Sequence, residues 1–144
     1  MRTQGTGNFL TRRSWFRAII TEDVVLCGSS ALEMLEMFNG LINQDYVEVY
    51  ALEKGKYENF DYHIVETFDN LDLVQFGNVR CTSFEQTVND MLSDMYNADI
   101  WALTEALSNY FYSHHESFDG LNIRPENMAA FESVREEAIN YYNC

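Results

Sequence analysis

Apolar residues in the first forty positions recur with helical spacing on either side of one short strand. The stretch 10–20 has its large apolar side chains on one face, which predicts a short helix. The β-branched run 24–26 predicts a strand that ends at a Cys-Gly pair. Ser30 and Glu33 have the spacing of a capping box, so a second helix is expected from there to the Asn-Gly pair 39–40.

The middle of the chain changes to alternation with a period of two. Apolar and polar residues alternate through 46–52, which is typical of a strand with one wet face, and 60–67 is a second strand candidate. The polar segment 53–59 between them predicts a turn, so the two strands are expected to form a hairpin. A further short strand is expected at 79–81, after the turn signal Gly77-Asn78.

The second half of the chain returns to helical spacing. Hydroxyl residues at 82–83 precede Glu and Gln at capping-box spacing, and predict a helix through Met95. Asp99 is expected to cap the next helix, which runs to about His115, and Pro125 opens the last one. The predicted fold class is α+β: a small mixed or antiparallel sheet of three to four strands packed by helices, with a helical C-terminal half.

Charge divides the chain into two unequal parts. It carries 23 acidic and nine basic residues among 144, for a net charge of −14. Residues 1–17 hold four arginines and no acid, which leaves 23 acids against five bases, a net −18, in the rest. We therefore predict a flexible basic N-terminal tail with a short helix at 1–23 and a single acidic α+β domain at 24–144. Such a surface repels nucleic acid and favours basic proteins, although acidity also simply keeps a domain soluble.

Cysteine usage and hydropathy indicate where such a chain functions. The three cysteines, Cys27, Cys81 and Cys144, are odd in number and far apart, unlike a disulfide framework. We expect reduced thiols. The sequence has no apolar run of about 18 residues and no apolar signal-peptide core, so we expect no membrane contact and a cytoplasmic location.

Common catalytic signatures are absent: the chain has no P-loop and no G-x-S-x-G, H-E-x-x-H or C-x-x-C motif. The strand-to-helix turn 27–30 does resemble the Gly-Ser turn with which nucleotidyltransferases hold a phosphate. That chemistry also needs a pair of carboxylates to bind magnesium, and only Glu48 and Glu53 follow on the next strand. We expect a non-enzymatic protein that requires no cofactor, with a nucleotidyltransferase kept as a third hypothesis.

One set of residues suggests a structural zinc. Cys27, His63 and Cys81 are each predicted on or beside short strands, where thiolates and an imidazole can converge. The alternative is that the cysteines are small buried apolar residues and the histidine is hydrogen-bonded within the fold. His114 and His115 are neighbours on a helix, so their rings diverge and they are better explained as residues of a helix C-terminus.

Tyrosines and acids gather around the predicted hairpin. Tyrosine gives contact area at low entropic cost, and carboxylates pair with Arg and Lys, so this mixture suits a surface for a basic partner. Asp90, Asp94 and Asp99 are better explained as an ordinary solvated face. The seven candidate partner-binding residues are Glu48, Tyr50, Glu53, Tyr57, Glu58, Asp61 and Tyr62.

Three segments resemble the C-terminal domain of AbiEi-type abortive-infection antitoxins, over about 120 residues. They are Val24-Val-Leu-Cys-Gly-Ser-Ser-Ala-Leu-Glu33 with its Phe38-Asn-Gly-Leu41 exit, Tyr46-Val-Glu-Val-Tyr50, and Gly77-Asn-Val-Arg-Cys-Thr-Ser-Phe-Glu-Gln-Thr-Val-Asn-Asp90. The resemblance implies alternating strand and helix units. Such antitoxins usually carry an N-terminal winged helix-turn-helix, for which the residues before Val24 are too few, so promoter binding is not expected.

An acidic domain of this type, without enzymatic motifs, is similar in class to phage-encoded anti-CRISPR proteins. That class implies an inhibitor that occupies a basic surface of a CRISPR nuclease and blocks DNA loading or binding in the cytoplasm of a bacterial host cell. The function expected is therefore non-enzymatic inhibition of a nucleic-acid-handling protein. The alternative is an antitoxin domain that neutralises a partner toxin.

Overall fold

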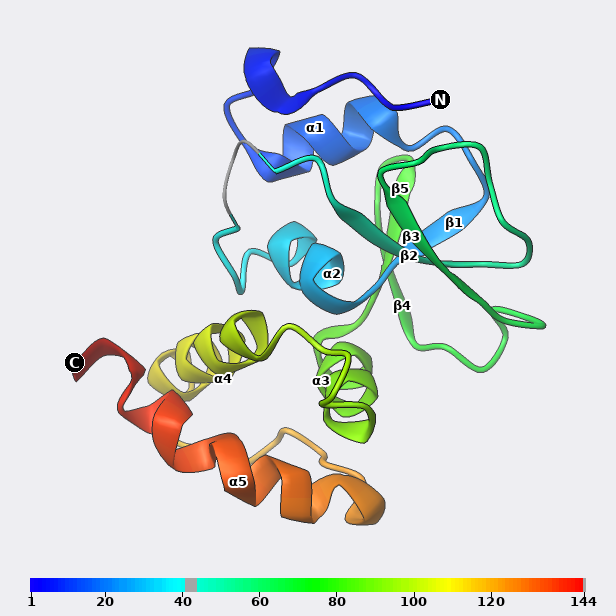
Figure 1. The fold of residues 1–144 in the computed structure, drawn as a ribbon. Helices are drawn as coiled ribbons and strands as arrows, with labels where there is room; N and C mark the ends of the chain where they lie inside the picture. Colours follow the sequence, from blue (N-terminus) through cyan, green and yellow to red (C-terminus); the bar gives the residue numbers. More distant parts are fainter. Residues whose placement is uncertain (41–43, 144) are drawn as a thin grey trace.

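Five helices and five strands form within residues 1–40 and 44–143, which the computed structural model describes (Figure 1). Short 3-10 turns lie at Thr6–Asn8, Pro125–Asn127 and Tyr141–Asn143. The elements in chain order are α1 (Arg12–Ile19), β1 (Val24–Leu26), α2 (Gly28–Met34), β2 (Val47–Ala51), β3 (Phe60–Ile64), β4 (Leu73–Phe76), β5 (Val79–Thr82), α3 (Phe84–Ser93), α4 (Ile100–Ser113) and α5 (Met128–Ile139).

The strands make one mixed sheet in the order β3-β2-β1-β5-β4. β1 pairs antiparallel with β2 and parallel with β5, and β4 pairs antiparallel with β5. The helices α3, α4 and α5 follow the sheet and form a separate layer (Figure 1). The predicted α+β class with a helical C-terminal half is confirmed. The sheet has five strands instead of three to four, because β4 was not predicted.

The predicted hairpin of β2 and β3 is wrong. The two strands run parallel, with Val47 opposite Phe60 and Ala51 opposite Ile64. The segment 52–59 is long enough to carry the chain back to the start of β2, and alternation along a strand does not depend on the direction of its neighbour. The hairpin lies instead between β4 and β5, where Gly77 adopts a φ of +62° in the turn.

The N-terminal segment packs against the sheet, although the sequence predicted a flexible tail. Trp15 and Phe16 on α1 are fully buried, and the indole of Trp15 donates a hydrogen bond to the carbonyl of Gln4 at 2.9 Å. Arg12 stacks over the Trp15 ring and forms an ion pair with Glu33 of α2 at 2.6 Å. Burial of two large aromatic side chains offsets the entropy lost in ordering the segment. Residues of the predicted tail thus belong to the core.

Two apolar clusters fill the interior, and α2 contributes to both. Ala31 and Met34 of α2 pack with α1 and the sheet, whereas Leu32 packs with α3, α4 and α5. On β2 the side chains alternate, so that Val47 and Val49 enter the sheet core while the residues between them point to the other face. That other face, near the start of α2, is where the polar side chains gather.

Predicted caps explain where α3 and α4 begin. Ser83 accepts a hydrogen bond from the backbone N–H of Gln86, and Asp99 accepts one from Ala102. The predicted bounds of α2 differ from those observed: the helix begins at Gly28, before the predicted cap at Ser30, and ends at Met34, before the Asn-Gly pair 39–40. The hydroxyl of Ser30 does not cap it, because it accepts a hydrogen bond from the backbone N–H of Glu48 at 2.8 Å instead.

Both cysteines within the described residues are free and buried, namely Cys27 and Cys81. Cys144 and Leu41, which entered the sequence argument, lie outside those residues. No helix in the described part of the chain combines the length and apolar character needed to cross a bilayer.

Candidate functional site

Three side chains with metal-binding atoms meet at one end of β1. Cys27 directly follows β1, Glu48 lies on β2 and His63 lies on β3, so the three come from neighbouring strands. Their ligand atoms all lie within 4.8 Å of one another. The site thus contains a Cys–Glu–His cluster, and the name is used below for these three residues.

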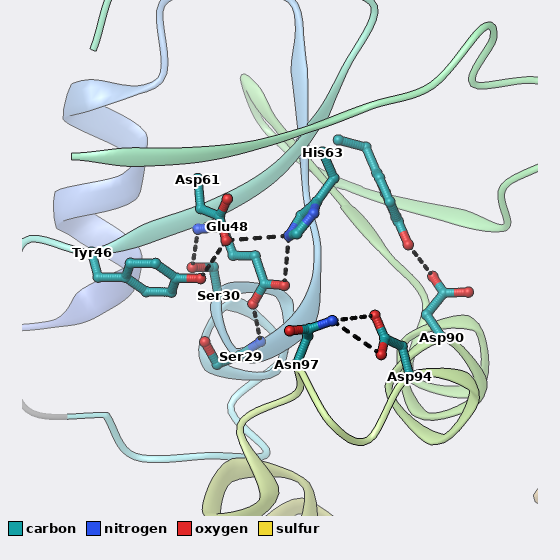
Figure 2. A network of polar contacts seen from close by, with 10 residues as sticks. Ser29, Ser30, Tyr46, Glu48, Asp61, His63, Asp90, Asp94 and Asn97 are labelled. Carbon is teal, nitrogen blue, oxygen red and sulfur yellow. Dashed lines mark hydrogen bonds and ion pairs between the residues drawn. The ribbon is translucent and has the colours of Figure 1, made fainter. Parts of the chain in front are cut away.

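Glu48 holds the cluster together through both carboxylate oxygens. Its Oε1 accepts a hydrogen bond from the backbone N–H of Ser29 at 3.3 Å, and its Oε2 lies 3.0 Å from Nε2 of His63 (Figure 2). This hydrogen bond to Glu48 raises the pKa of His63, while partial burial opposes the rise. Burial, followed by the charge of Glu48, raises the pKa of Cys27 well above its ordinary value.

Two further residues, Asp61 on β3 and Tyr46 just before β2, lie beside the cluster. Asp61 lies opposite Glu48 in the parallel register, and its Oδ2 is 3.4 Å from Nε2 of His63. The phenol of Tyr46 donates a hydrogen bond to the same carboxylate at 2.9 Å (Figure 2). Burial and the neighbouring carboxylates raise the pKa of Tyr46, so the phenol remains a donor near neutral pH.

The opposite wall of the site comes from α3 and the turn after it. Asp90 accepts hydrogen bonds from the phenol of Tyr50 at 2.9 Å and from the amide of Gln86 at 2.8 Å. Asn97 donates to both carboxylate oxygens of Asp94 (Figure 2). Together with the Cys–Glu–His cluster these residues line a cleft of about 250 Å³, and its described lining includes no Lys or Arg.

At the Gly-Ser turn where α2 begins, the carboxylate of Glu48 takes the place that a phosphate would fill. Glu48 accepts the Ser29 N–H, which is the kind of donor that would hold a phosphate. Glu53, the second carboxylate considered for magnesium, lies beyond β2 and lines a separate surface pocket. Nucleotidyl transfer at this turn would therefore require Glu48 to move and a different second carboxylate.

The close approach of Glu48 to Gly28 leads to a prediction about stability. Gly28 has a φ of +52°, and a Cβ placed there would lie 2.2 Å from Oε1 of Glu48. We expect Gly28→Ala to lower the free energy of unfolding by about 2–3 kcal/mol, from backbone strain plus displacement of the carboxylate. The measurement is urea denaturation.

Gly77→Ala is the matched control for that variant. Gly77 has a similar φ of +62°, but nothing lies within 4 Å of the Cβ it would gain. Its cost should be the backbone strain alone, about 1 kcal/mol. Equal losses for the two variants would show that the Glu48 carboxylate is not held against the turn.

Asp90 gives the cleft a predictable pH dependence. Burial raises the pKa of Asp90, although its hydrogen bonds from Tyr50 and Gln86 oppose the rise. At pH values above the ordinary pKa of an aspartate, Asp90 then binds more protons in the folded state than in the unfolded state. Its contribution to stability therefore increases as the pH falls, and it is lost as the pH rises through the raised pKa. Relative to Asp90→Asn, the native protein should gain stability from neutral pH to about pH 4.

Chemical denaturation across that pH range, with a chelator present, measures the effect. Asp69→Asn serves as a control because Asp69 is exposed and does not line the cleft. The same pH slope in the native protein and in Asp90→Asn would contradict the assignment to Asp90.

The predicted metal set is only partly assembled. Cys27 and His63 come together as expected, but Cys81 of β5 packs into the sheet core with α1 and is not part of the cluster. Glu48 takes the third place, although the sequence argument had assigned it to the partner surface. The ring of His114 stacks on Tyr110 at the exposed end of α4.

The seven candidate partner-binding residues, called here the β2–β3 patch, are divided between the two faces of the sheet. Glu48 and Tyr50 line the cleft just described, and Asp61 lies beside His63 on the same face. Tyr57 and Tyr62 pack against the sheet core on the other face, and the phenol of Tyr62 donates to Glu22 at 2.5 Å. Glu53 and Glu58 are exposed in the loop 52–59. Most of these polar groups are therefore already used within the domain, and partner contact at them remains a prediction.

A groove between α4 and α5 was not predicted from the sequence. It has a volume of about 660 Å³, and Trp101, with 75% of its surface exposed, stands at its wall. The Tyr141 ring lies edge-on to the Trp101 ring, with 6.4 Å between centroids. Three glutamates of α5, Glu132, Glu136 and Glu137, also line what is called here the α4–α5 groove.

Comparison with known proteins provides no relative from which to transfer a function. No protein-family model matches the chain, and no curated protein matches its sequence. The resemblances seen in the sequence therefore stay predictions, and the proposals below rest on the residues of the cleft and the groove.

Proposed function

We propose that this domain is a non-enzymatic acidic inhibitor that binds a basic surface of a nucleic-acid-handling protein. In its most specific form it is an anti-CRISPR protein that blocks DNA loading or binding by a CRISPR nuclease. The α4–α5 groove is the proposed contact surface. The observation that carries the proposal is an exposed tryptophan beside three glutamates, with no Lys or Arg in the described lining of the groove.

The charges of the groove are left without partners inside the domain. None of Glu132, Glu136 and Glu137 forms an ion pair within the described residues. Glu132 and Glu136 are four residues apart on one helix, a spacing at which like charges repel and destabilise the helix. A cation from a partner removes that repulsion.

The chemistry of the groove selects an arginine-rich or lysine-rich segment. A guanidinium or ammonium group is attracted to the face of Trp101, and its charge pairs with the neighbouring carboxylates. Exposed large aromatic side chains in a pocket are also the residues that dominate interface energies. Basic segments of this kind line the grooves in which nucleic-acid-binding proteins hold phosphates.

The arginine of α5 does not line this groove: Arg135 lies over the Phe118 ring, 6.0 Å from its centroid. Three further arginines pair with acids elsewhere in the domain. Arg12 and Arg13 pair with Glu33 and Glu36, and Arg80 pairs with Asp23. The positive charge near the N-terminus thus fixes α1 to α2, and the surface keeps its acidic excess. We propose no direct binding to nucleic acid and no cofactor requirement for inhibition. A structural zinc in the Cys–Glu–His cluster is the one metal proposed.

Salt dependence of binding tests the charge-driven contact. Affinity for a purified guide-loaded CRISPR nuclease should fall steeply with salt, and target DNA should compete. Glu132→Lys with Glu136→Lys should weaken binding and reduce the salt dependence that remains. Salt-independent affinity, or binding that persists beside bound target DNA, would contradict the proposal.

The same assay decides whether the β2–β3 patch takes part. Reversal of Glu53, Glu58 and Asp61 to Lys removes three negative charges from the loop and the adjacent strand. If these side chains contact the partner, affinity and its salt dependence both fall. Unchanged binding would remove the patch from the interface and leave the α4–α5 groove as the contact surface.

A further inference from the structure

We propose that the Cys–Glu–His cluster binds one zinc ion, a property independent of the inhibitor role. The three residues offer a thiolate sulfur, a carboxylate oxygen and an imidazole nitrogen, which are the three protein donor types that zinc accepts. Ligand atoms within 4.8 Å of one another are already gathered around one point.

The strand pairing fixes these ligands independently of one another. The backbone N–H of Cys27 donates to the carbonyl of Glu48 at 3.0 Å, which places the two residues side by side across β1 and β2. His63 pairs with Tyr50 in the parallel register of β2 and β3, so its ring lies diagonal to Glu48 on the same face. Each ligand thus comes from a different strand of a regular sheet.

Only small side-chain movements are needed to close the site around a metal. Zinc–ligand bonds of about 2.0–2.3 Å in a tetrahedron place ligand atoms roughly 3.3–3.8 Å apart. Oε2 of Glu48 and Nε2 of His63 are 3.0 Å apart, joined by the hydrogen bond that a metal would replace. Ser29 would still hold the other carboxylate oxygen through its N–H, and so orient the ligand.

Charge and donor type favour zinc over magnesium or calcium. A thiolate is a soft ligand that magnesium and calcium do not select, whereas zinc binds it well. Binding releases the thiol proton of Cys27, so a doubly charged ion meets one thiolate and one carboxylate and the complex is neutral. A neutral complex is favourable here because the sulfur of Cys27 is buried and the described lining of the cleft has no Lys or Arg to balance a negative charge.

All three ligands line the cleft, so a fourth coordination position would be open to it. Cys27, Glu48 and His63 all line that cleft, opposite Asp90 and Asp94 of the other wall. A water molecule can complete the tetrahedron there. The ion would cross-link β1, β2 and β3 at the point where α2 begins, so its expected effect is on stability.

The experiment is a metal titration of the full chain, first freed of metal with a chelator. Cobalt replaces zinc in such sites and reports its ligands, because a thiolate gives a charge-transfer band in the near ultraviolet and tetrahedral Co²⁺ absorbs in the visible. We expect both signals at one cobalt per chain, and their loss when zinc is added. Zinc should also raise the thermal midpoint by roughly 5–10 °C at a hundredfold excess over its Kd.

Variants separate this cluster from other ligands on the chain. Cys27→Ser should abolish the charge-transfer band, and His63→Gln and Glu48→Gln should weaken metal binding at least tenfold. Cys81→Ser and His115→Gln are the matched controls and should keep the spectrum. Absence of a thiolate band in the native protein overturns the proposal even if a variant fails to fold, and a band that survives Cys27→Ser also overturns it.

Discussion

Trp101→Ala is expected to weaken binding to the partner nuclease by about 100-fold, the loss typical of an aromatic residue at the centre of an interface. The side chain is 75% exposed, so its removal should leave the domain folded. The lost contacts are the ring face that meets a cation and the wall of the groove. Binding measured by calorimetry or interferometry, with circular dichroism to confirm the fold, gives the result.

Tyr96→Ala is the matched control for the groove. Tyr96 is 96% exposed and does not line the α4–α5 groove. Its removal should change affinity by less than about threefold, as expected for a surface residue outside the contact. If Trp101→Ala and Tyr96→Ala bind equally well, the groove is not the interface.

Trp15→Ala is expected to lower the free energy of unfolding by about 3–5 kcal/mol, the usual cost of removing a large buried aromatic side chain. Trp15 is fully buried, donates its indole N–H to Gln4, and supports Arg12 in its ion pair with Glu33. The substitution therefore loosens α1 from both the sheet and α2. Urea denaturation measures the change.

Arg17→Ala is the control on the same helix. Arg17 is exposed, so its removal should change stability by less than about 0.5 kcal/mol. A loss below about 1 kcal/mol for Trp15→Ala would mean that the first 23 residues are the loose tail that the sequence had suggested, instead of part of the core.

Local signals in the sequence were sufficient for much of the fold. The β-branched run at Val24 and the hydroxyl and carboxylate caps at Ser83 and Asp99 each act within one turn of chain, so their effect could be predicted from neighbours alone. The prediction of a flexible tail at 1–23 was wrong. It relied on the polar, Gly-rich start of the chain, and local sequence does not show that Trp15 and Phe16 pack into the sheet core.

Features that depend on distant pairing could not be predicted in the same way. The parallel direction of β3 is set by contacts between Val47 and Phe60, thirteen residues apart, and alternation alone does not encode it. Direction and register decide which residues of β3 lie beside Glu48, and here they place His63 next to it in the Cys–Glu–His cluster. Had β2 and β3 formed a hairpin, a different residue of β3 would face Glu48.

The α4–α5 groove illustrates the same limit for a surface. Trp101 and Glu136 are 35 residues apart in sequence, and each alone is an unremarkable exposed position. Only the packing of α4 on α5 places the ring beside the carboxylates. The acidic composition predicts a basic partner, but it does not indicate which surface would contact that partner.

DNA cleavage by a panel of purified guide-loaded CRISPR nucleases, with the domain added before or after target DNA, decides whether the domain is an anti-CRISPR inhibitor. We predict inhibition of one member when the domain is added first, little when DNA is already bound, and loss of inhibition with Trp101→Ala. Unchanged cleavage across the panel would contradict an anti-CRISPR role, and neutralisation of a co-encoded toxin would then identify the domain as an antitoxin.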